Sequence, residues 1–267
     1  MILRVIFSLA IVLLQANSAI AEQVKLGVTS SFHNSGLSDH LIPHVEADLA
    51  IDIQLLVVGT GQAIKLGANG DVDAILVHSR PDEEELVKSG FAKYRRQIMV
   101  NEFVIVGPSN DPAQIASAGN LIEAFKRLSK ARVNFVSRGD FSGTHKKEIE
   151  IWNEINFNPE NIGSQYISVG SSMGKAINIA VAFDAYILSD QATWLNHKNK
   201  GNLIIQFKGD RLLHNQYAFL PINPAIHAHV KNQPVEKIEE WLVSKKAKNL
   251  INSYIIENTQ VFTFNAQ

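Results

Sequence analysis

The feature of this chain that most constrains its fold is the alternation of short apolar runs with longer amphipathic ones. From Val24 onward the apolar runs are short and rich in β-branched residues, as in Ile51–Val58 and Phe103–Gly107. The amphipathic runs place apolar residues on one helical face, as in residues 37–49. This alternation predicts an α/β fold with mainly parallel strands flanked by helices.

Three junctions between a predicted strand and the segment after it carry hydroxyl groups and glycines. They are Thr29-Ser30-Ser31, Gly59-Thr60-Gly61-Gln62 and the stretch Ser137–His145. Glycines in such loops let backbone N–H groups approach a ligand, although Gly59 and Gly61 could equally form an ordinary tight turn. The junctions are the first candidates for a binding site.

The stretch Ser137–His145 has the composition of an anion site. It lies between an apolar, strand-like run and an amphipathic run, so the unpaired N–H groups and positive dipole end of a helix should face its loop. Arg138 adds a planar set of donors that keeps its charge, and Ser142 and Thr144 can donate or cap the helix. A plain helix cap beside a surface arginine is the alternative at this stretch.

The overall composition is that of an ordinary globular protein. The chain has 267 residues, 46% of them hydrophobic and 19% charged, with a formal net charge of -1. This length is enough for two modest lobes, and the lack of a basic excess argues against a nucleic-acid-binding protein. The chain has no cysteine, which excludes disulfides and lipid attachment through an N-terminal cysteine.

The first residues predict a cleavable export signal. Arg4 provides the positive start, residues 5–14 the apolar stretch, and Ala19-Ile20-Ala21 the small-residue cleavage site. The stretch is shorter than the roughly 20 apolar residues that a membrane span needs. We therefore expect cleavage after Ala21 and a periplasmic protein that is not a lipoprotein.

Several motifs occur in an order that is typical of one family. They are Thr29-Ser30-Ser31 with Asn34-Ser35-Gly36-Leu37, then Val58–Ala63, Asn101–Pro108, Ser137–Lys147 and Asn215-Gln216-Tyr217. This series resembles the tungstate-binding TupA family of bacterial ABC importers. The resemblance implies a two-lobed periplasmic binding protein of type II, each lobe a mainly parallel sheet flanked by helices, with the ligand in the cleft. Residues 22–102 and 219–267 would form lobe 1, and residues 103–218 lobe 2.

The resemblance also implies a set of oxyanion-binding residues. Asp140 is assigned to holding Arg138 or capping the helix, because a carboxylate facing a dianion would repel it. The sequence departs from the family pattern at Val28 and Ser30, where threonines are usual, at Phe32, which replaces a smaller residue, and at Phe141, where an aspartate is common. The predicted contacts are Thr29, Ser30, Thr60, Arg138 and Thr144, with Ser31, Ser142 and Ser171 as weaker candidates.

The implied function is that of a receptor that captures tungstate and delivers it to a membrane permease driven by an ATPase. Under this interpretation the chain is a monomer, is not an enzyme and needs no cofactor. Hydroxyls, N–H groups and one arginine suit a fully deprotonated oxyanion, whereas phosphate keeps a proton and benefits from an acceptor carboxylate. Binding of molybdate, phosphate or a sulfonate instead stays open as an alternative.

Parts of the sequence also fit two other classes of site. Gly170-Ser171-Ser172-Met173-Gly174 fits the G-x-S-x-G pattern of serine hydrolases, with Ser172 as nucleophile. Asp184, Asp190 or Asp210 with His214, His227 or His229 would complete its triad. His40 with His44, and His227 with His229, have spacings compatible with a metal, but neither pair has a third ligand nearby in sequence. We expect structural histidines, no metal site and no hydrolase.

Overall fold

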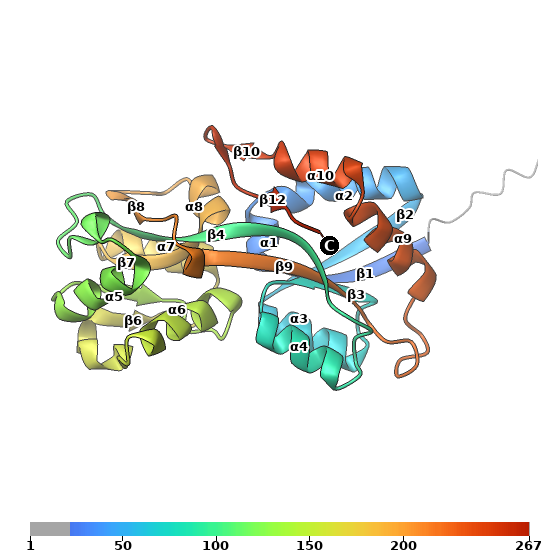
Figure 1. The fold of residues 1–267 in the computed structure, drawn as a ribbon, viewed down its shortest axis with the longest axis horizontal. Helices are drawn as coiled ribbons and strands as arrows, with labels where there is room; N and C mark the ends of the chain where they lie inside the picture. The colour runs from blue at the N-terminus through green and yellow to red at the C-terminus, as the bar shows by residue number, and fades with distance from the viewer. Residues whose placement is uncertain (1–21, 267) are drawn as a thin grey trace, which may run out of the picture.

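The computed structural model describes residues 22–266, so the expected signal peptide over residues 1–21 lies outside the described part of the chain. Figure 1 shows two lobes side by side, joined by the long strands β4 (Arg96–Pro108) and β9 (His214–Pro221). Within residues 22–266, no helix combines the length and apolar character needed to cross a bilayer.

The first lobe is built on three parallel strands that alternate with helices, as the sequence pattern predicts. The run Ala74–Val77 is apolar throughout because its side chains enter two cores. Leu76 belongs to one hydrophobic cluster and Ile75 and Val77 to another, so alternate residues cover opposite faces of the strand. The elements are β1 (Glu22–Thr29), α1 (Ser30–Asn34), α2 (Leu37–Leu49), β2 (Ile51–Val58), α3 (Thr60–Asn69), β3 (Ala74–Val77) and α4 (Arg80–Lys88).

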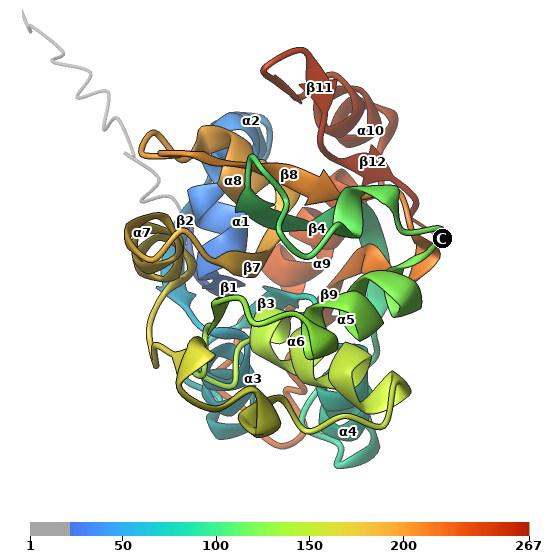
Figure 2. The ribbon, with the colours of Figure 1, turned by 90° about the vertical axis from the view of Figure 1, so that its left-hand side faces the viewer.

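The second lobe repeats this layering with parallel strands β5, β6 and β7. Phe135 packs into a cluster with α5 and α6, whereas Val136 packs into one with α7. Figure 2 shows α5 and α6 on one side of these strands and α7 on the other. The elements are η1 (Ile115–Ser117), α5 (Leu121–Lys130), β5 (Phe135–Ser137), α6 (Gly143–Glu154), η2 (Pro159–Gln165), β6 (Tyr166–Ser168), α7 (Met173–Ala182), β7 (Tyr186–Asp190), α8 (Gln191–Asn196), β8 (Leu203–Phe207) and η3 (Arg211–Leu213).

One mixed sheet of ten strands runs through both lobes, its main path in the order β2-β1-β3-β9-β4-β7-β5-β6. The strand β4 begins at Arg96 rather than at Phe103, where the apolar run begins. It pairs with β9 over residues 96–102 and with β7 over residues 103–106, both antiparallel. The predicted α/β architecture is confirmed, and the two antiparallel strands are what connect its halves.

The C-terminal segment returns to the first lobe. Val235 and Ile251, from the two last helices, enter the same hydrophobic cluster as Val24 and Leu26. The last helix ends at Asn252, where the chain turns into a short hairpin. The elements are α9 (Asn232–Leu242), α10 (Lys245–Asn252), β10 (Ile255–Ile256), β11 (Thr259–Gln260) and β12 (Thr263–Phe264), the last of which pairs with β4.

The three tryptophans are buried in the hydrophobic cores. Trp152 packs in a T-shaped arrangement against Phe125, with ring centroids 4.5 Å apart, and Trp194 lies in the α7 cluster. Trp241 lies in the first lobe and donates from its indole Nε1 to Asp48 Oδ2 at 2.7 Å. Their packing supports both lobes and gives none of them a role in the cleft.

Candidate functional site

The junction residues meet where the two lobes touch. Thr29 ends β1, Thr60 begins α3 and is separated from β2 by Gly59 alone, Arg138 follows β5, and Thr144 lies in the first turn of α6. All four are at least 96% buried. The backbone N–H of Gly143 in α6 donates to Thr60 Oγ1 at 3.3 Å, so the second and third junctions are in direct contact. Ligands of open α/β sheets bind at such carboxyl ends of strands.

The first junction forms a network of buried hydroxyl groups. Ser31 Oγ lies 2.9 Å from Thr29 Oγ1, 2.9 Å from His78 Nε2 and 3.1 Å from Tyr217 OH. Thr29 is the N-cap of α1, because its Oγ1 accepts from the N–H of Phe32 at 3.2 Å. Ser30 is partly exposed beside this network. Ser31 therefore links several side chains and is less available to a ligand than its position in sequence suggests.

Arg138 is held in place from two sides. Its Nη2 forms an ion pair with Asp140 Oδ2, and its Nε donates to the carbonyl of Ser171 at 3.3 Å. Asp140 Oδ1 also accepts from the backbone N–H of Ser142 at 3.1 Å. Burial lowers the pKa of the Arg138 guanidinium and Asp140 partly offsets this, but an arginine keeps its charge in either case. These two contacts involve Nε and Nη2, which leaves Nη1 outside both of them.

The start of α6 presents further donors. Ser142 is its N-cap and accepts from the N–H of His145 at 3.4 Å. Thr144 Oγ1 is buried and has no hydrogen-bond partner among the described residues, so it is a donor that an anion at this position could use. Phe141 has a φ of 56° and is 74% exposed, so its ring points to solvent. The weaker candidate Ser171 contributes its carbonyl to Arg138.

His78 is a site residue that the sequence interpretation missed. It follows β3 just as Thr29 ends β1, and its ring packs on Tyr217 with centroids 4.7 Å apart. Burial, and to a smaller extent Arg138, lower the pKa of His78 to about 4, so the ring is neutral near pH 7. The signal that could have found it is its position after a fully apolar strand, the same rule that selected Thr29.

The charges around the cluster favour an anion. Among residues 22–266, the one carboxylate that is hydrogen-bonded to a predicted ligand residue is that of Asp140, which is turned to Arg138. The other groups named above are hydroxyls, backbone N–H groups and a neutral imidazole. An arrangement of this kind can stabilise a negative ion by charge-assisted hydrogen bonds, each worth about 1.5 to 3 kcal/mol. Among the described residues of the cluster, no hydroxyl is paired with a base and a carboxylate as an activated nucleophile would be.

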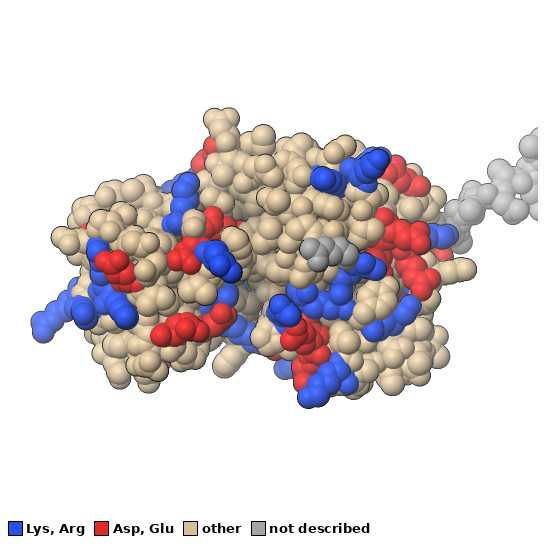
Figure 3. All heavy atoms as spheres, viewed as in Figure 1, with Lys and Arg blue, Asp and Glu red and all other residues tan. Residues whose placement is uncertain are grey.

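A cavity of about 1120 Å³ opens between the lobes beside this cluster. His78 and Gly143 belong to its lining, whereas Thr29, Thr60, Arg138 and Thr144 do not. The face drawn in Figure 3 carries charges of both signs and is hollowed between the lobes. Lys146 of α6 and Asp82 of α4, which also line the cavity, form an ion pair across it. The cluster thus lies behind the open cleft, shut off from solvent.

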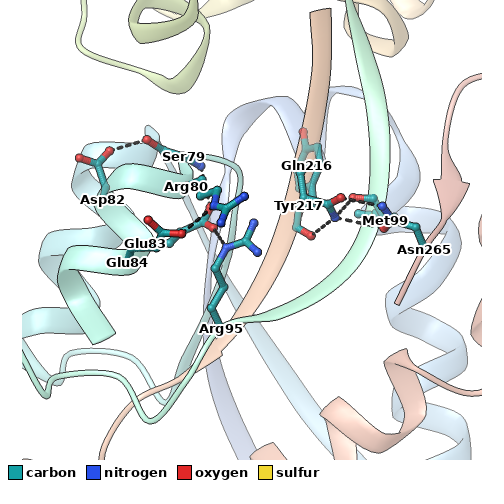
Figure 4. Close-up of polar contacts among 10 residues, drawn as sticks. All are labelled: Ser79, Arg80, Asp82, Glu83, Glu84, Arg95, Met99, Gln216, Tyr217 and Asn265. Carbon is teal, nitrogen blue, oxygen red and sulfur yellow. Dashed lines mark hydrogen bonds and ion pairs between the residues drawn. The ribbon is translucent and has the colours of Figure 1, made fainter. Parts of the chain in front are cut away.

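The start of α4 is fixed by its own polar contacts, which Figure 4 shows together with Tyr217 on β9. Ser79 Oγ donates to Asp82 Oδ2 at 2.6 Å, and the Ser79 N–H donates to Glu83 Oε1 at 2.6 Å. Burial raises the pKa of Glu83 to about 7, although its ion pair with Arg95 lowers it. These contacts hold Asp82 where Lys146 can reach it.

The alternative sites do not assemble. Ser172 is exposed at the start of α7, and among the described residues no histidine or carboxylate is hydrogen-bonded to it. The Nε2 atoms of His227 and His229 lie 2.9 Å and 2.8 Å from the carbonyl oxygens of Ala68 and Gly70, which gives these rings a structural role. Within residues 22–266 there is no group of three or more His, Asp or Glu side chains placed to hold a metal.

Comparison with known proteins places this geometry in a family. The PBP superfamily domain matches residues 16–250. The tungstate-binding protein TupA of Peptoclostridium acidaminophilum is 39% identical over 245 residues, which cover 90% of this chain and 85% of that protein. The tungstate-binding protein TupA of Campylobacter jejuni is 34% identical over 241 residues and 89% of each chain.

Solved structures agree with these relatives. The tungstate-binding protein TupA of Desulfovibrio alaskensis G20 superposes with a TM-score of 0.81 at 35% identity, over 92% of this chain and all of that one. The tungstate ABC transporter structure from Geobacter sulfurreducens has a TM-score of 0.81 at 39% identity, over 87% of this chain and 99% of that one. These are binding proteins, so the serine-hydrolase alternative is wrong. The chain therefore belongs to the PBP superfamily and, within it, to the TupA family.

Proposed function

We propose that this protein is the solute-binding component of an ABC importer, that it captures tungstate, and that it delivers the ion to a membrane permease driven by an ATPase. The observation that carries the proposal is the cluster of buried donors from both lobes, in which Asp140 is turned to Arg138 and Thr144 Oγ1 has no partner among the described residues. The relatives named as tungstate-binding proteins support the same ion.

The proposed contacts are Thr29, Ser30 and Thr60 from the first lobe and Arg138 and Thr144 from the second. A fully deprotonated dianion has only acceptor oxygens, so hydroxyl, N–H and guanidinium donors match it without an inward carboxylate. Phosphate near neutral pH would lack an acceptor for its proton. This difference favours tungstate or molybdate over phosphate.

Ligand binding is proposed to favour contact between the lobes. Because each lobe supplies donors, the ion gains its full set of hydrogen bonds only when the lobes close over it. In this scheme residues 22–102 and 219–267 form lobe 1 and residues 103–218 form lobe 2. The mature chain would act as a monomer in the periplasm, which light scattering of residues 22–267 would check.

Titration calorimetry of the ligand-free protein tests the function. Residues 22–267 would be titrated with tungstate, molybdate, sulfate and phosphate under identical conditions. We expect tight binding of tungstate and much weaker binding of phosphate. Sulfate is a smaller dianion, so its affinity tests whether the site selects ions by size. Tighter binding of phosphate than of tungstate would refute the assignment, and the molybdate titration ranks the nearest competitor.

A further inference from the structure

Ser31 is the centre of a chain of side-chain hydrogen bonds in which the direction of the protons matters. Its three partners are Thr29 Oγ1, His78 Nε2 and Tyr217 OH, and all of these residues are at least 92% buried. A serine hydroxyl has one proton to donate and two lone pairs that accept. Three partners therefore use its whole hydrogen-bonding capacity, and it can donate to only one of them.

Thr29 determines which partner receives the proton of Ser31. This inference rests on the proposed function, in which Thr29 binds the ion. Its Oγ1 already accepts from the N–H of Phe32. A deprotonated oxyanion cannot donate, so Thr29 must give its own proton to the ion. The contact of 2.9 Å between Thr29 and Ser31 then needs the proton of Ser31, because two oxygens this close with no proton between them repel. Ser31 must donate to Thr29.

Only lone pairs of Ser31 then face its other two partners. Tyr217 can donate, since burial raises the pKa of its hydroxyl and keeps the proton on it. His78 must therefore carry its proton on Nε2. The other ring nitrogen, Nδ1, is buried and makes no hydrogen bond of normal geometry among the described residues, and the nearby side chain of Asn215 raises the pKa of the ring less than burial lowers it. Unpaired buried acceptors are tolerated more often than unpaired buried N–H groups.

We propose that His78 is a positioning residue that donates from Nε2 to Ser31 and so turns the protons of Ser31 and Thr29 toward the bound oxyanion. Every hydrogen bond in this series is then donated in the same direction, from His78 and Tyr217 to Ser31, from Ser31 to Thr29, and from Thr29 to the ion. The His78 ring packs against Tyr217 and Phe103, and this packing holds it at hydrogen-bonding distance from Ser31. His78 acts through Ser31 and is not itself a ligand of the ion.

Two substitutions at His78 distinguish the role of its hydrogen-bond donor from the role of its ring. His78→Phe keeps a ring but removes the donor, whereas His78→Gln places an amide N–H near the position of Nε2. We expect His78→Phe to weaken tungstate binding in calorimetry by about ten- to a hundredfold and His78→Gln by less than about fivefold. His40→Phe is the matched control, because His40 also packs on an aromatic ring, that of Tyr254 at 5.1 Å, and its buried Nε2 has no hydrogen-bond partner within residues 22–266. It should bind tungstate like the wild type.

Nitrogen-15 NMR of the His78 ring in the tungstate-loaded wild-type protein gives a second test that does not depend on a variant folding. We expect a neutral ring with its proton on Nε2. A proton on Nδ1, or equal weakening by His78→Phe and His78→Gln, would overturn the inference while tungstate capture stands. A wild-type protein that binds none of the four anions would instead overturn the proposed function, and this inference with it.

Discussion

Lys146 of α6 and Asp82 of α4 form an ion pair that joins the two lobes across the cleft. Asp82 is held for this contact by the hydroxyl of Ser79 at 2.6 Å. Because the two charged groups belong to different lobes, the pair can form only while the lobes touch. It therefore adds to the stability of the same state that the ligand is proposed to favour.

Removing this ion pair should weaken ligand retention modestly. The side chains of Lys146 and Asp82 are 39% and 29% exposed, and ion pairs of this kind contribute about 0.2 to 1 kcal/mol. We expect Lys146→Ala to weaken tungstate binding about two- to fivefold at low salt, mainly through faster release measured by stopped flow, and less at high salt. Lys147→Ala is the control, since Lys147 pairs with Glu150 within the same helix. Equal effects of the two substitutions would exclude a role for the contact between lobes.

Gly143 is a point at which the backbone of helix α6 lies close to the first lobe, where its N–H donates to Thr60 Oγ1 at 3.3 Å. A Cβ atom there would lie 2.5 Å from His78 Cε1 and 3.2 Å from Thr60 Oγ1. We expect Gly143→Ala to weaken tungstate binding about ten- to a hundredfold, the range of an overpacking cost of about 1 to 3 kcal/mol. The melting temperature of the ligand-free protein should change by less than about 4 °C, because the lobes can move apart.

Gly174 provides the matched control for this substitution. It lies in the first turn of α7, and a Cβ atom there would meet nothing within 4 Å. Gly174→Ala should leave both binding and melting temperature close to those of the wild type. If Gly143→Ala binds tungstate as tightly as Gly174→Ala, the lobes do not close at Gly143 in the way that the structure indicates.

The junctions could be predicted from the sequence because the signals for a strand end and a helix start are local. Thr29 and Thr60 are identified by the residues directly around them, and so is Arg138. Each side chain lies at the carboxyl end of a short apolar strand, where the α/β topology brings such ends together. The α/β class was predictable for the same reason, since the alternation of apolar and amphipathic runs can be read in short windows.

The roles of His78 and Tyr217, and the single sheet through both lobes, could not be predicted because they depend on long-range pairing. In the structure Val77 lies opposite Ala218, and Leu76 opposite Phe219, which places Tyr217 beside His78. Nothing near either residue in sequence specifies this register. The extension of β4 back to Arg96 has the same origin, since its first residues are stabilised by pairing with β9.

Arg138 is expected to supply much of the binding free energy but little of the folding free energy. Arg138→Ala removes the charged fork from the site and leaves Asp140, which is 18% exposed, without its cation. We expect tungstate binding to weaken at least about a hundredfold in calorimetry, because charge-assisted hydrogen bonds are lost and a carboxylate is left near the dianion. The thermal unfolding curve should change little.

A second variant separates the effect of the Asp140 charge on tungstate affinity from the effect of losing Arg138. In Arg138→Ala/Asp140→Asn the carboxylate is neutralised, so any repulsion between it and the ion disappears, and binding should recover in part. Arg127→Ala is the control, since Arg127 pairs with Glu123 on α5. An affinity of Arg138→Ala equal to that of Arg127→Ala would show that Arg138 does not contact the ion.

Glu148 should make the stability of the second lobe depend on pH. It is 2% exposed on α6, accepts from Tyr166 OH at 2.7 Å and from Trp152 Nε1 at 3.3 Å, and burial raises its pKa from 4.5 to about 7. The folded state thus holds this proton more tightly than the unfolded state does. Stability from Glu148 is therefore fully present below about pH 4.5, falls as pH rises to about 7, and is constant above that.

Glu148→Gln isolates this effect, because the amide oxygen can still accept both hydrogen bonds but carries no charge. We expect the free energy of unfolding of the variant, relative to wild type, to increase by about 2 to 3 kcal/mol between pH 5 and pH 8, measured by urea unfolding of the ligand-free protein. Glu150→Gln, at a position on the same helix that is 55% exposed, should show no such trend. A difference between Glu148→Gln and wild type that stays constant with pH would mean that Glu148 is already charged in the folded protein at pH 5.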